Sequence, residues 1–146
     1  MSDARLRKYV LVDTGFWFGL CDEHDQHHEK SLRVFDMVKR FRLLFPWPVL
    51  YEVLNTRFIR HQPRVIQFDV KLRGLAFDYI EDQVYRQAAY EETMALALPG
   101  KRQISLVDMV VRHMLADVNL RVDYLVTYND GDFTDICKKR KIELVN

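Results

Sequence analysis

Two short apolar runs constrain the fold of this chain more than any other feature of its sequence. Tyr9-Val10-Leu11-Val12 and Tyr124-Leu125-Val126-Thr127 are rich in β-branched residues and contain no charged residue. Continuous apolar runs of this length are typical of strands that are buried on both faces. Helical patterns separate the strand-like segments, and this alternation indicates a parallel sheet covered by helices on both sides. We therefore predict an α/β fold.

The remaining segments complete this prediction. Trp47 lies between Pro46 and Pro48, so we expect no regular strand there and no helical position for the tryptophan. After Asp13, the segment Asp13-Thr14-Gly15 is expected to form a turn. We expect amphipathic or buried helices at 27–41, 52–60 and 105–117, two helices within 63–98 separated by a turn or short strand, a short extended run at 43–50, and an edge strand at 141–145.

Bulk composition limits the class of protein but not its partner. The 146 residues are enough for one domain, 1–146, and the net charge of +1 neither requires nor excludes a nucleic acid. No apolar stretch approaches the roughly 18 residues of a membrane span. Two cysteines, Cys21 and Cys137, do not suggest a disulfide framework. We expect a cytoplasmic protein that does not associate with a membrane.

Acidic residues recur where the apolar runs end or where helices begin. Asp13 ends the first run, Glu52 follows the extended segment, and Asp108 lies near the start of the helix at 105–117. Asp130 and Asp132 follow the second run in the sequence Asn129-Asp130-Gly131-Asp132. Because ligands bind at the carboxyl ends of parallel strands, these side chains are expected to gather at one edge of the sheet.

Each acidic residue also has a simpler structural interpretation. Asp13 suits a turn or a helix N-cap, and Glu52 in a first helical turn would complement the helix dipole. Asp108 can complete a capping box with Ser105 or pair with Arg112 one turn later. Asn129-Asp130-Gly131 is a common turn sequence. Taken singly, none of these residues indicates a catalytic site.

Their combination favours a metal site. Neighbouring carboxylates repel one another, whereas Mg²⁺ or Mn²⁺ accepts hard oxygen ligands and removes the conflict. Four acidic groups could serve two ions roughly 3.5–4 Å apart, the arrangement used to hydrolyse phosphodiesters. A metal-dependent nuclease is therefore the leading hypothesis from the residues alone.

The chain also resembles the PIN-domain ribonucleases, and most closely the VapC-type toxins of bacterial toxin–antitoxin pairs. The segments that carry the resemblance are VLVDTGFWFGL, DEHDQHHEKS, VLYEVLNTRF, SLVDMVVRHMLAD and LVTYNDGDF, within residues 9–60 and 104–146. The resemblance implies a three-layer α/β/α sandwich around a parallel sheet. It also implies Mg²⁺- or Mn²⁺-dependent cleavage of RNA, a small antitoxin as partner, and a homodimer.

Carried over by position, the resemblance implies a metal-binding and catalytic set that begins with Asp13, Glu52 and Asp108. The fourth acid is Asp132 by preference, with Asp130 and Asn129 as alternatives. Thr14 matches the small hydroxyl residue that follows the first aspartate in the family. Arg57 and Arg60 lie one to two turns beyond Glu52 and are candidates for binding a flanking phosphate. A non-catalytic PIN-like module that binds RNA or protein is the alternative from another class.

Overall fold

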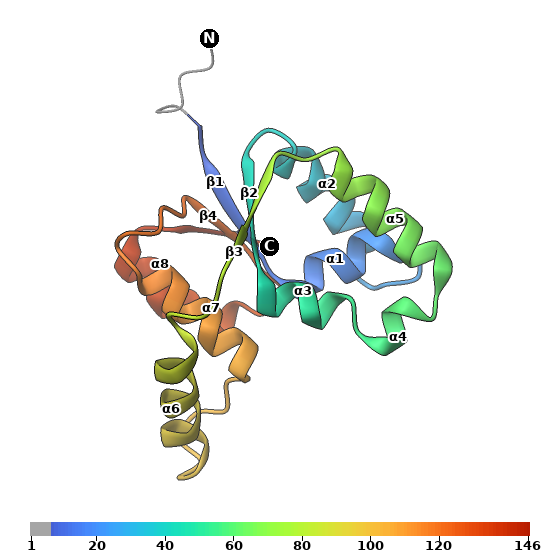
Figure 1. Cartoon of the computed structure of the whole chain (residues 1–146). Helices are drawn as coiled ribbons and strands as arrows, with labels where there is room; N and C mark the ends of the chain where they lie inside the picture. The colour runs from blue at the N-terminus through green and yellow to red at the C-terminus, as the bar shows by residue number, and fades with distance from the viewer. Residues whose placement is uncertain (1–6) are drawn as a thin grey trace.

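The computed structural model describes residues 7–146, in which five parallel strands form one sheet (Figure 1). The strand order is β3-β2-β1-β4-β5, so the chain first runs from the centre to one edge and then returns to build the other half. The order reverses between β1 and β4, which makes the carboxyl ends of these two strands the expected ligand site. The strands are β1 (Tyr9–Val12), β2 (Arg42–Pro46), β3 (Phe77–Ile80), β4 (Tyr124–Val126) and β5 (Glu143–Val145).

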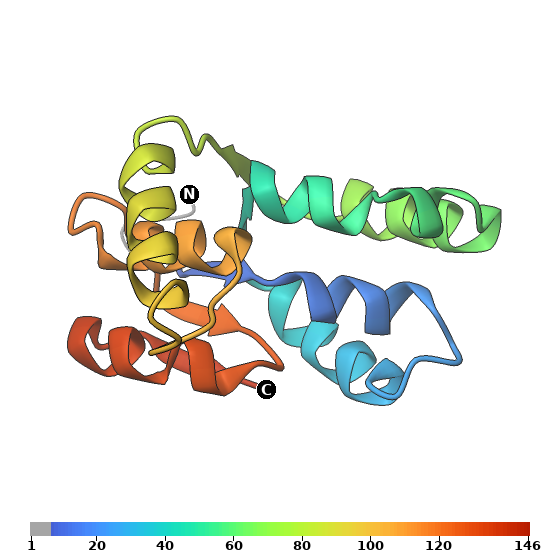
Figure 2. The same cartoon turned by 90° about the horizontal axis from the view of Figure 1, so that it is seen from below.

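Helices cover both sides of the sheet, as Figures 1 and 2 show from two directions. The connections between β1, β2 and β3 carry the helices of one layer: α1 (Thr14–Cys21), α2 (His28–Val38), α3 (Trp47–Val53), α4 (Thr56–Ile59) and α5 (Gln62–Arg73). The other layer contains α6 (Arg86–Ala97), α7 (Leu106–Ala116), the 3-10 turn η1 (Asp130–Asp132) and α8 (Thr134–Arg140). The predicted three-layer α/β/α sandwich with a central parallel sheet is confirmed.

The two apolar runs form the central strands, as predicted. Val10, Leu11, Leu125 and Val126 are fully buried, and β1 and β4 pair directly with Leu11 opposite Leu125. Burial on both faces explains why these strands tolerate no polar alternation. The predicted helices at 27–41 and 105–117 correspond to α2 and α7, and the predicted edge strand corresponds to β5. Residues 63–98 contain α5 and α6 with the edge strand β3 between them.

Residues after Asp13 form a helix, so the expected turn at 13–15 is wrong. Asp13 is the N-cap of α1, and its side chain accepts a hydrogen bond from the backbone N–H of Thr14. The helix is apolar on nearly all sides and shows no amphipathic period that would reveal it. Gly19 is needed at its contact with α2, because a Cβ there would lie 2.4 Å from Ser31 Oγ. Phe16 and Trp17 are buried in the core.

The segment from Pro46 to Val53 also differs from the prediction. The extended run ends at Pro46, and Trp47 begins α3 because proline is compatible with the first turn of a helix. The Trp47 ring stacks on Tyr79 of the edge strand at 4.8 Å, and its indole N–H donates to Glu81. Glu52 therefore lies in the last turn of α3 and not at a helix start, so it cannot complement the positive end of the helix dipole.

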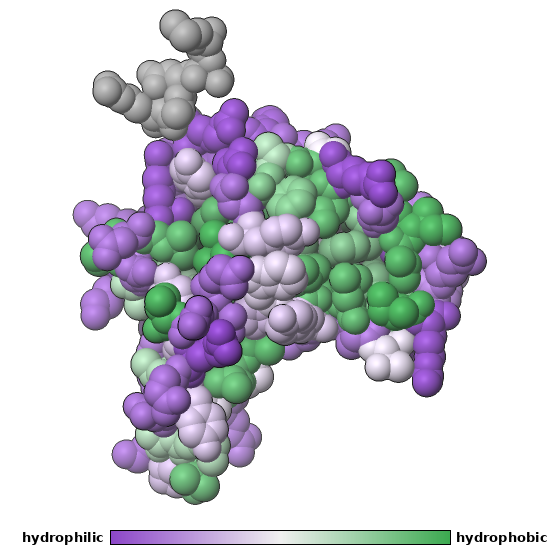
Figure 3. Space-filling view, in the orientation of Figure 1, coloured by the Kyte–Doolittle hydropathy of each residue, from purple (hydrophilic) through white to green (hydrophobic). Residues whose placement is uncertain are grey.

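One face of the molecule is notably apolar. Figure 3 shows hydrophobic residues gathered over the region that contains α3, α5 and β3 in the same view as Figure 1. Exposed large side chains on these elements include Tyr51, Ile66, Val70 and Tyr79.

Within residues 7–146, none of the helices has the length and apolar character needed to cross a membrane.

Candidate metal and catalytic site

The candidate site is built around Asp13, which follows β1 and lies 7% exposed at the start of α1. Its backbone N–H donates to the carbonyl of Val126, which ties the end of β1 to the end of β4. One carboxylate oxygen accepts from Thr14 N–H and the other from the hydroxyl of Thr127, at 2.8 and 3.0 Å. Asp13 is thus both an N-cap and an oriented, nearly buried carboxylate.

Thr127 is a member of the site that the sequence did not reveal. It is fully buried, and its hydroxyl donates to Asp13 while accepting a hydrogen bond from the backbone N–H of Asn129 at 3.0 Å. One side chain therefore fixes both the first aspartate and the start of the loop that carries Asp132. A hydroxyl residue at the end of an otherwise apolar strand was the available signal.

Asp108 shows most clearly that the four carboxylates act on one another electrostatically. Burial raises the pKa of Asp108 to about 7, with further contributions from the negative charges of Asp13, Asp132 and Glu52 and from a hydrogen bond with Asp132. Burial likewise raises the pKa of Asp13. The negative charges of Glu52 and Asp132 raise this pKa further, whereas the hydrogen bonds from Thr14 and Thr127 lower it. Residues from three separate helices and one turn therefore influence one another electrostatically, while their role as a metal site stays a prediction.

Asp108 does not pair with Arg112, so that structural interpretation is wrong. The backbone N–H of Asp108 donates to Ser105 Oγ at 3.2 Å, which is the first half of the proposed capping box. Arg112, one turn further along α7, instead forms two hydrogen bonds with Asp135. Asp135 was not a candidate from the sequence, and Arg112 neutralises it rather than the acidic cluster.

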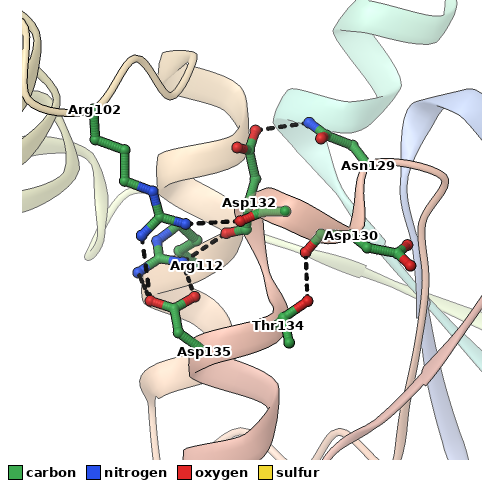
Figure 4. Close-up of polar contacts among 8 residues, drawn as sticks. Arg102, Arg112, Asn129, Asp130, Asp132, Thr134 and Asp135 are labelled. Carbon is green, nitrogen blue, oxygen red and sulfur yellow. Dashed lines mark hydrogen bonds and ion pairs between the residues drawn. The ribbon is translucent and has the colours of Figure 1, made fainter.

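At the fourth acidic position the side chains of Asp130 and Asp132 point in different directions (Figure 4). Asp132 accepts a hydrogen bond from the Asn129 amide at 2.7 Å and contributes to the raised pKa of both Asp13 and Asp108. Asp130 is hydrogen-bonded to the Asn146 side chain. This geometry favours Asp132 over Asp130 as the fourth member of the site.

The carboxylate oxygens of the four acids are the ligand type that a hard divalent cation prefers, although they do not form a complete coordination shell. Among residues 7–146, no three or more acidic, histidine or cysteine side chains are arranged closely enough to hold a metal ion. Mg²⁺, however, is commonly held by one or two carboxylates together with waters and phosphate oxygens, so a closed protein cage is not required. The buried hydroxyl of Thr14, next to Asp13, has no hydrogen-bond partner among the described residues, which fits a position beside a further ligand.

Comparison with known proteins relates this architecture to solved structures. No family model matches the chain, and no curated protein matches its sequence. Two similar solved structures are VapC20 of Mycobacterium tuberculosis, described as a Sarcin-Ricin loop cleaving toxin, and VapBC2 of Rickettsia felis bound to a promoter DNA fragment. The chain has the fold of the VapC toxins.

For VapC20 the TM-score is 0.63 at 19% identity, over 86% of this chain and 94% of that one. For VapBC2 the TM-score is 0.62 at 18% identity, over 94% and 98%. At these identities the VapC likeness establishes the fold, while activity and partners depend on the site itself.

Arg57 lies in α4, and Arg60 is the C-cap residue of that helix. Both are exposed, and no hydrogen bond or ion pair within residues 7–146 joins either of them to the four carboxylates. Arg57 lines a cavity of about 240 Å³ with Phe18 and Phe58, near the ion pair between Arg64 and Asp22. Phosphate binding by Arg57 and Arg60 therefore stays a prediction.

Glu52 borders a larger groove between α3, α6 and α7. The groove has a volume of about 600 Å³ and is lined by aromatic, aliphatic and charged side chains: Pro48, Tyr51, Glu52, Asp82, Arg86, Gln87, Tyr90, Leu106, Val107 and Val110. Of the four candidate acids, Glu52 is the one that lines this groove.

Proposed function

We propose that this chain is a metal-dependent endoribonuclease and the toxin of a toxin–antitoxin pair. The observation that carries the proposal is the mutual charge repulsion of Asp13, Glu52, Asp108 and Asp132, whose side chains form no ion pair with an arginine or lysine among residues 7–146. Carboxylates held together in this way destabilise the protein unless a cation or protons neutralise them. The VapC-type fold supports an RNA substrate, since VapC20 is described as a toxin that cleaves the Sarcin-Ricin loop.

The residues of the site would have different roles, some in binding the metal and others in orienting its ligands. Asp13 and Asp108 would hold Mg²⁺ or Mn²⁺, with Glu52 and Asp132 binding through waters or holding a second ion. When bound, the metal lowers the pKa of a water and neutralises charge on the reacting phosphate. Thr127 keeps one oxygen of Asp13 oriented, and Asn129 does the same for Asp132. Glu52, which lines the groove, would orient the attacking water.

The remaining expected partners fit the same proposal. VapBC2 is a toxin–antitoxin complex by name, which supports a small antitoxin as the partner of this chain. The exposed apolar side chains on α3, α5 and β3, including Tyr51, Ile66 and Tyr79, provide a surface for a homodimer. An RNA substrate supports a cytoplasmic location for the protein.

Cleavage of RNA by the purified protein tests the activity. A pool of single-stranded and hairpin RNA oligonucleotides should be cut with Mn²⁺ present and left intact with EDTA. Asp13→Asn should abolish cleavage, whereas Asp69→Asn, which removes an exposed carboxylate paired with Arg73, should cut at the wild-type rate. Cleavage by Asp13→Asn at the wild-type rate would contradict the proposal.

A binding module without catalysis is the second candidate, favoured by the absence of a closed metal cage among residues 7–146. Calorimetric titration with Mn²⁺ separates the two functions. The nuclease should take up Mn²⁺ in a way that Asp13→Asn removes. A module that only binds RNA or protein should take up no Mn²⁺ that depends on Asp13.

A further inference from the structure

An ion pair between Arg112 and Asp135 lies next to the turn that carries Asp132 (Figure 4). Arg112 donates from two nitrogens to the two carboxylate oxygens of Asp135, at 2.7 and 3.0 Å. Arg102 donates to the same carboxylate at 3.3 Å. Arg112 is only 13% exposed, and the two-point geometry is the strong form of an arginine–carboxylate pair. Asp135 therefore fixes the direction of both guanidinium groups.

The same two arginines hold the backbone of the turn that carries Asp132. Arg112 donates to the carbonyl of Asp132 at 2.6 Å, and Arg102 donates to the carbonyl of Gly131 at 2.9 Å. These contacts come from α7 and from the loop that precedes it, so they tie η1 to the helix that carries Asp108. The position of Asp132 relative to Asp108 thus depends on Arg102, Arg112 and Asp135 together.

Arg112 is also the cation best placed to enter the acidic cluster. It follows Asp108 by four residues on α7, a spacing at which arginine and aspartate side chains can pair directly. In the described part of the chain, residues 7–146, Asp108 forms no ion pair with an arginine or lysine, and the charges of Asp13, Asp132 and Glu52 raise its pKa. Arg112 instead pairs with the Asp135 carboxylate, and its contact with Asp132 is to the backbone carbonyl.

We propose that Asp135 is a positioning residue with two roles, namely fixing η1 through the arginines and keeping Arg112 out of the metal site. Without Asp135, the guanidinium turns toward Asp108 and Asp132 and occupies the space and charge that a metal ion requires. This inference rests on the proposed function, because it assigns a metal to the four carboxylates. The proposal assigns a role to Asp135 and Arg112, which would influence the metal site without contacting the substrate.

Mn²⁺ titration of the full-length protein tests the exclusion of Arg112. Asp135→Asn should bind Mn²⁺ about tenfold to a hundredfold more weakly, the range found when partners of metal ligands are removed. Asp135→Glu keeps the charge and should bind nearly as the wild type does. Adding Arg112→Gln to Asp135→Asn removes the competing cation and should recover a large part of the affinity. Asp78→Asn, which breaks the other two-point pair, with Arg42, is the matched control and should leave Mn²⁺ binding unchanged.

Hydrogen exchange of the metal-free protein tests the hold on η1. Amides of residues 129–133 should exchange faster in Asp135→Asn than in Asp78→Asn, and Asp135→Glu should restore their protection. If the double variant binds Mn²⁺ no better than Asp135→Asn, Arg112 does not compete for the site and the exclusion role is refuted. Unchanged exchange at 129–133 refutes the positioning role. If the wild-type protein takes up no Mn²⁺, the proposed function fails, while the exchange result still decides whether Asp135 holds the turn.

Discussion

Replacing Asp108 with asparagine should stabilise the metal-free protein at neutral and alkaline pH. The pKa of Asp108 is raised from 3.8 to about 7, first by burial and then by the negative charges of Asp13, Asp132 and Glu52. A carboxyl group with a raised pKa in the folded state favours folding fully below its unfolded pKa. That contribution is lost as the pH rises through about 7. Asparagine stays neutral throughout and can still donate a hydrogen bond to Asp132.

The size of the effect follows from the pKa. A rise from 3.8 to about 7 corresponds to about 4 kcal/mol of destabilisation once the group is ionised. Asp108 is only half-buried, so solvent screening lowers the effect on the free energy of unfolding to about 2 kcal/mol. For a chain of this length that is a rise in melting temperature of about 6 °C.

Thermal unfolding in EDTA, at pH 4 and at pH 8, measures this difference directly. At pH 4 the wild type and Asp108→Asn should melt at nearly the same temperature, because Asp108 is protonated in the folded protein. At pH 8 the variant should melt at the higher temperature. Asp69→Asn should show no such gain, because Asp69 is an exposed carboxylate with an arginine partner.

Saturating Mn²⁺ should reverse the order at pH 8, because the metal stabilises only the protein that binds it. The wild type should then gain stability, and Asp108→Asn should gain little. A variant that melts below the wild type in EDTA at pH 8 would refute the reasoning. It would mean that the Asp108 carboxylate has a stabilising partner and that the four acids do not repel one another.

Two further substitutions test the supports of the site. Thr127→Val keeps the shape of the side chain but removes its hydrogen bonds to Asp13 and Asn129, so chemical denaturation should show a loss of about 2 kcal/mol and Mn²⁺ titration a weaker affinity. Unchanged stability and affinity would show that Thr127 does not orient Asp13. Gly19→Ala places a methyl group against Ser31 and should cost about 1–3 kcal/mol in the same denaturation assay. Gly74→Ala, where the added carbon meets only an ordinary contact at 3.6 Å, is its control, and equal stability of the two variants would contradict the steric argument.

The parts of the fold that could be predicted from the sequence are those set by local pattern. The apolar runs at β1 and β4 identify buried strands, and the carboxyl ends of parallel strands lie at the same edge of a sheet. Asp13 and Asp132 could therefore be brought together without coordinates. Asp108 could be identified as a candidate site residue because it lies on a largely apolar helix, where a carboxylate needs a partner.

Other features depend on contacts that leave no local signal. Helix α1 is apolar all round, so no helical period distinguishes it from a strand or turn, and its packing on α2 through Gly19 is a tertiary property. The start of α3 at Trp47 depends on prolines that are acceptable in a first turn but not later. Asp135 meets Arg112 across 23 residues, and nothing in either neighbourhood indicates the pairing.

The distribution of charge around η1 connects the site with its supports. On one side of the turn, Arg102 and Arg112 are both committed to Asp135 and to backbone carbonyls. On the other side, the Asp132 carboxylate accepts a hydrogen bond from the neutral amide of Asn129, and its charge raises the pKa of Asp13 and Asp108. If the acids served folding alone, the nearby arginines would stabilise the protein more by pairing with them. Their commitment to Asp135 leaves the carboxylates available to a cation from solution, which is the arrangement that a metal-dependent nuclease requires.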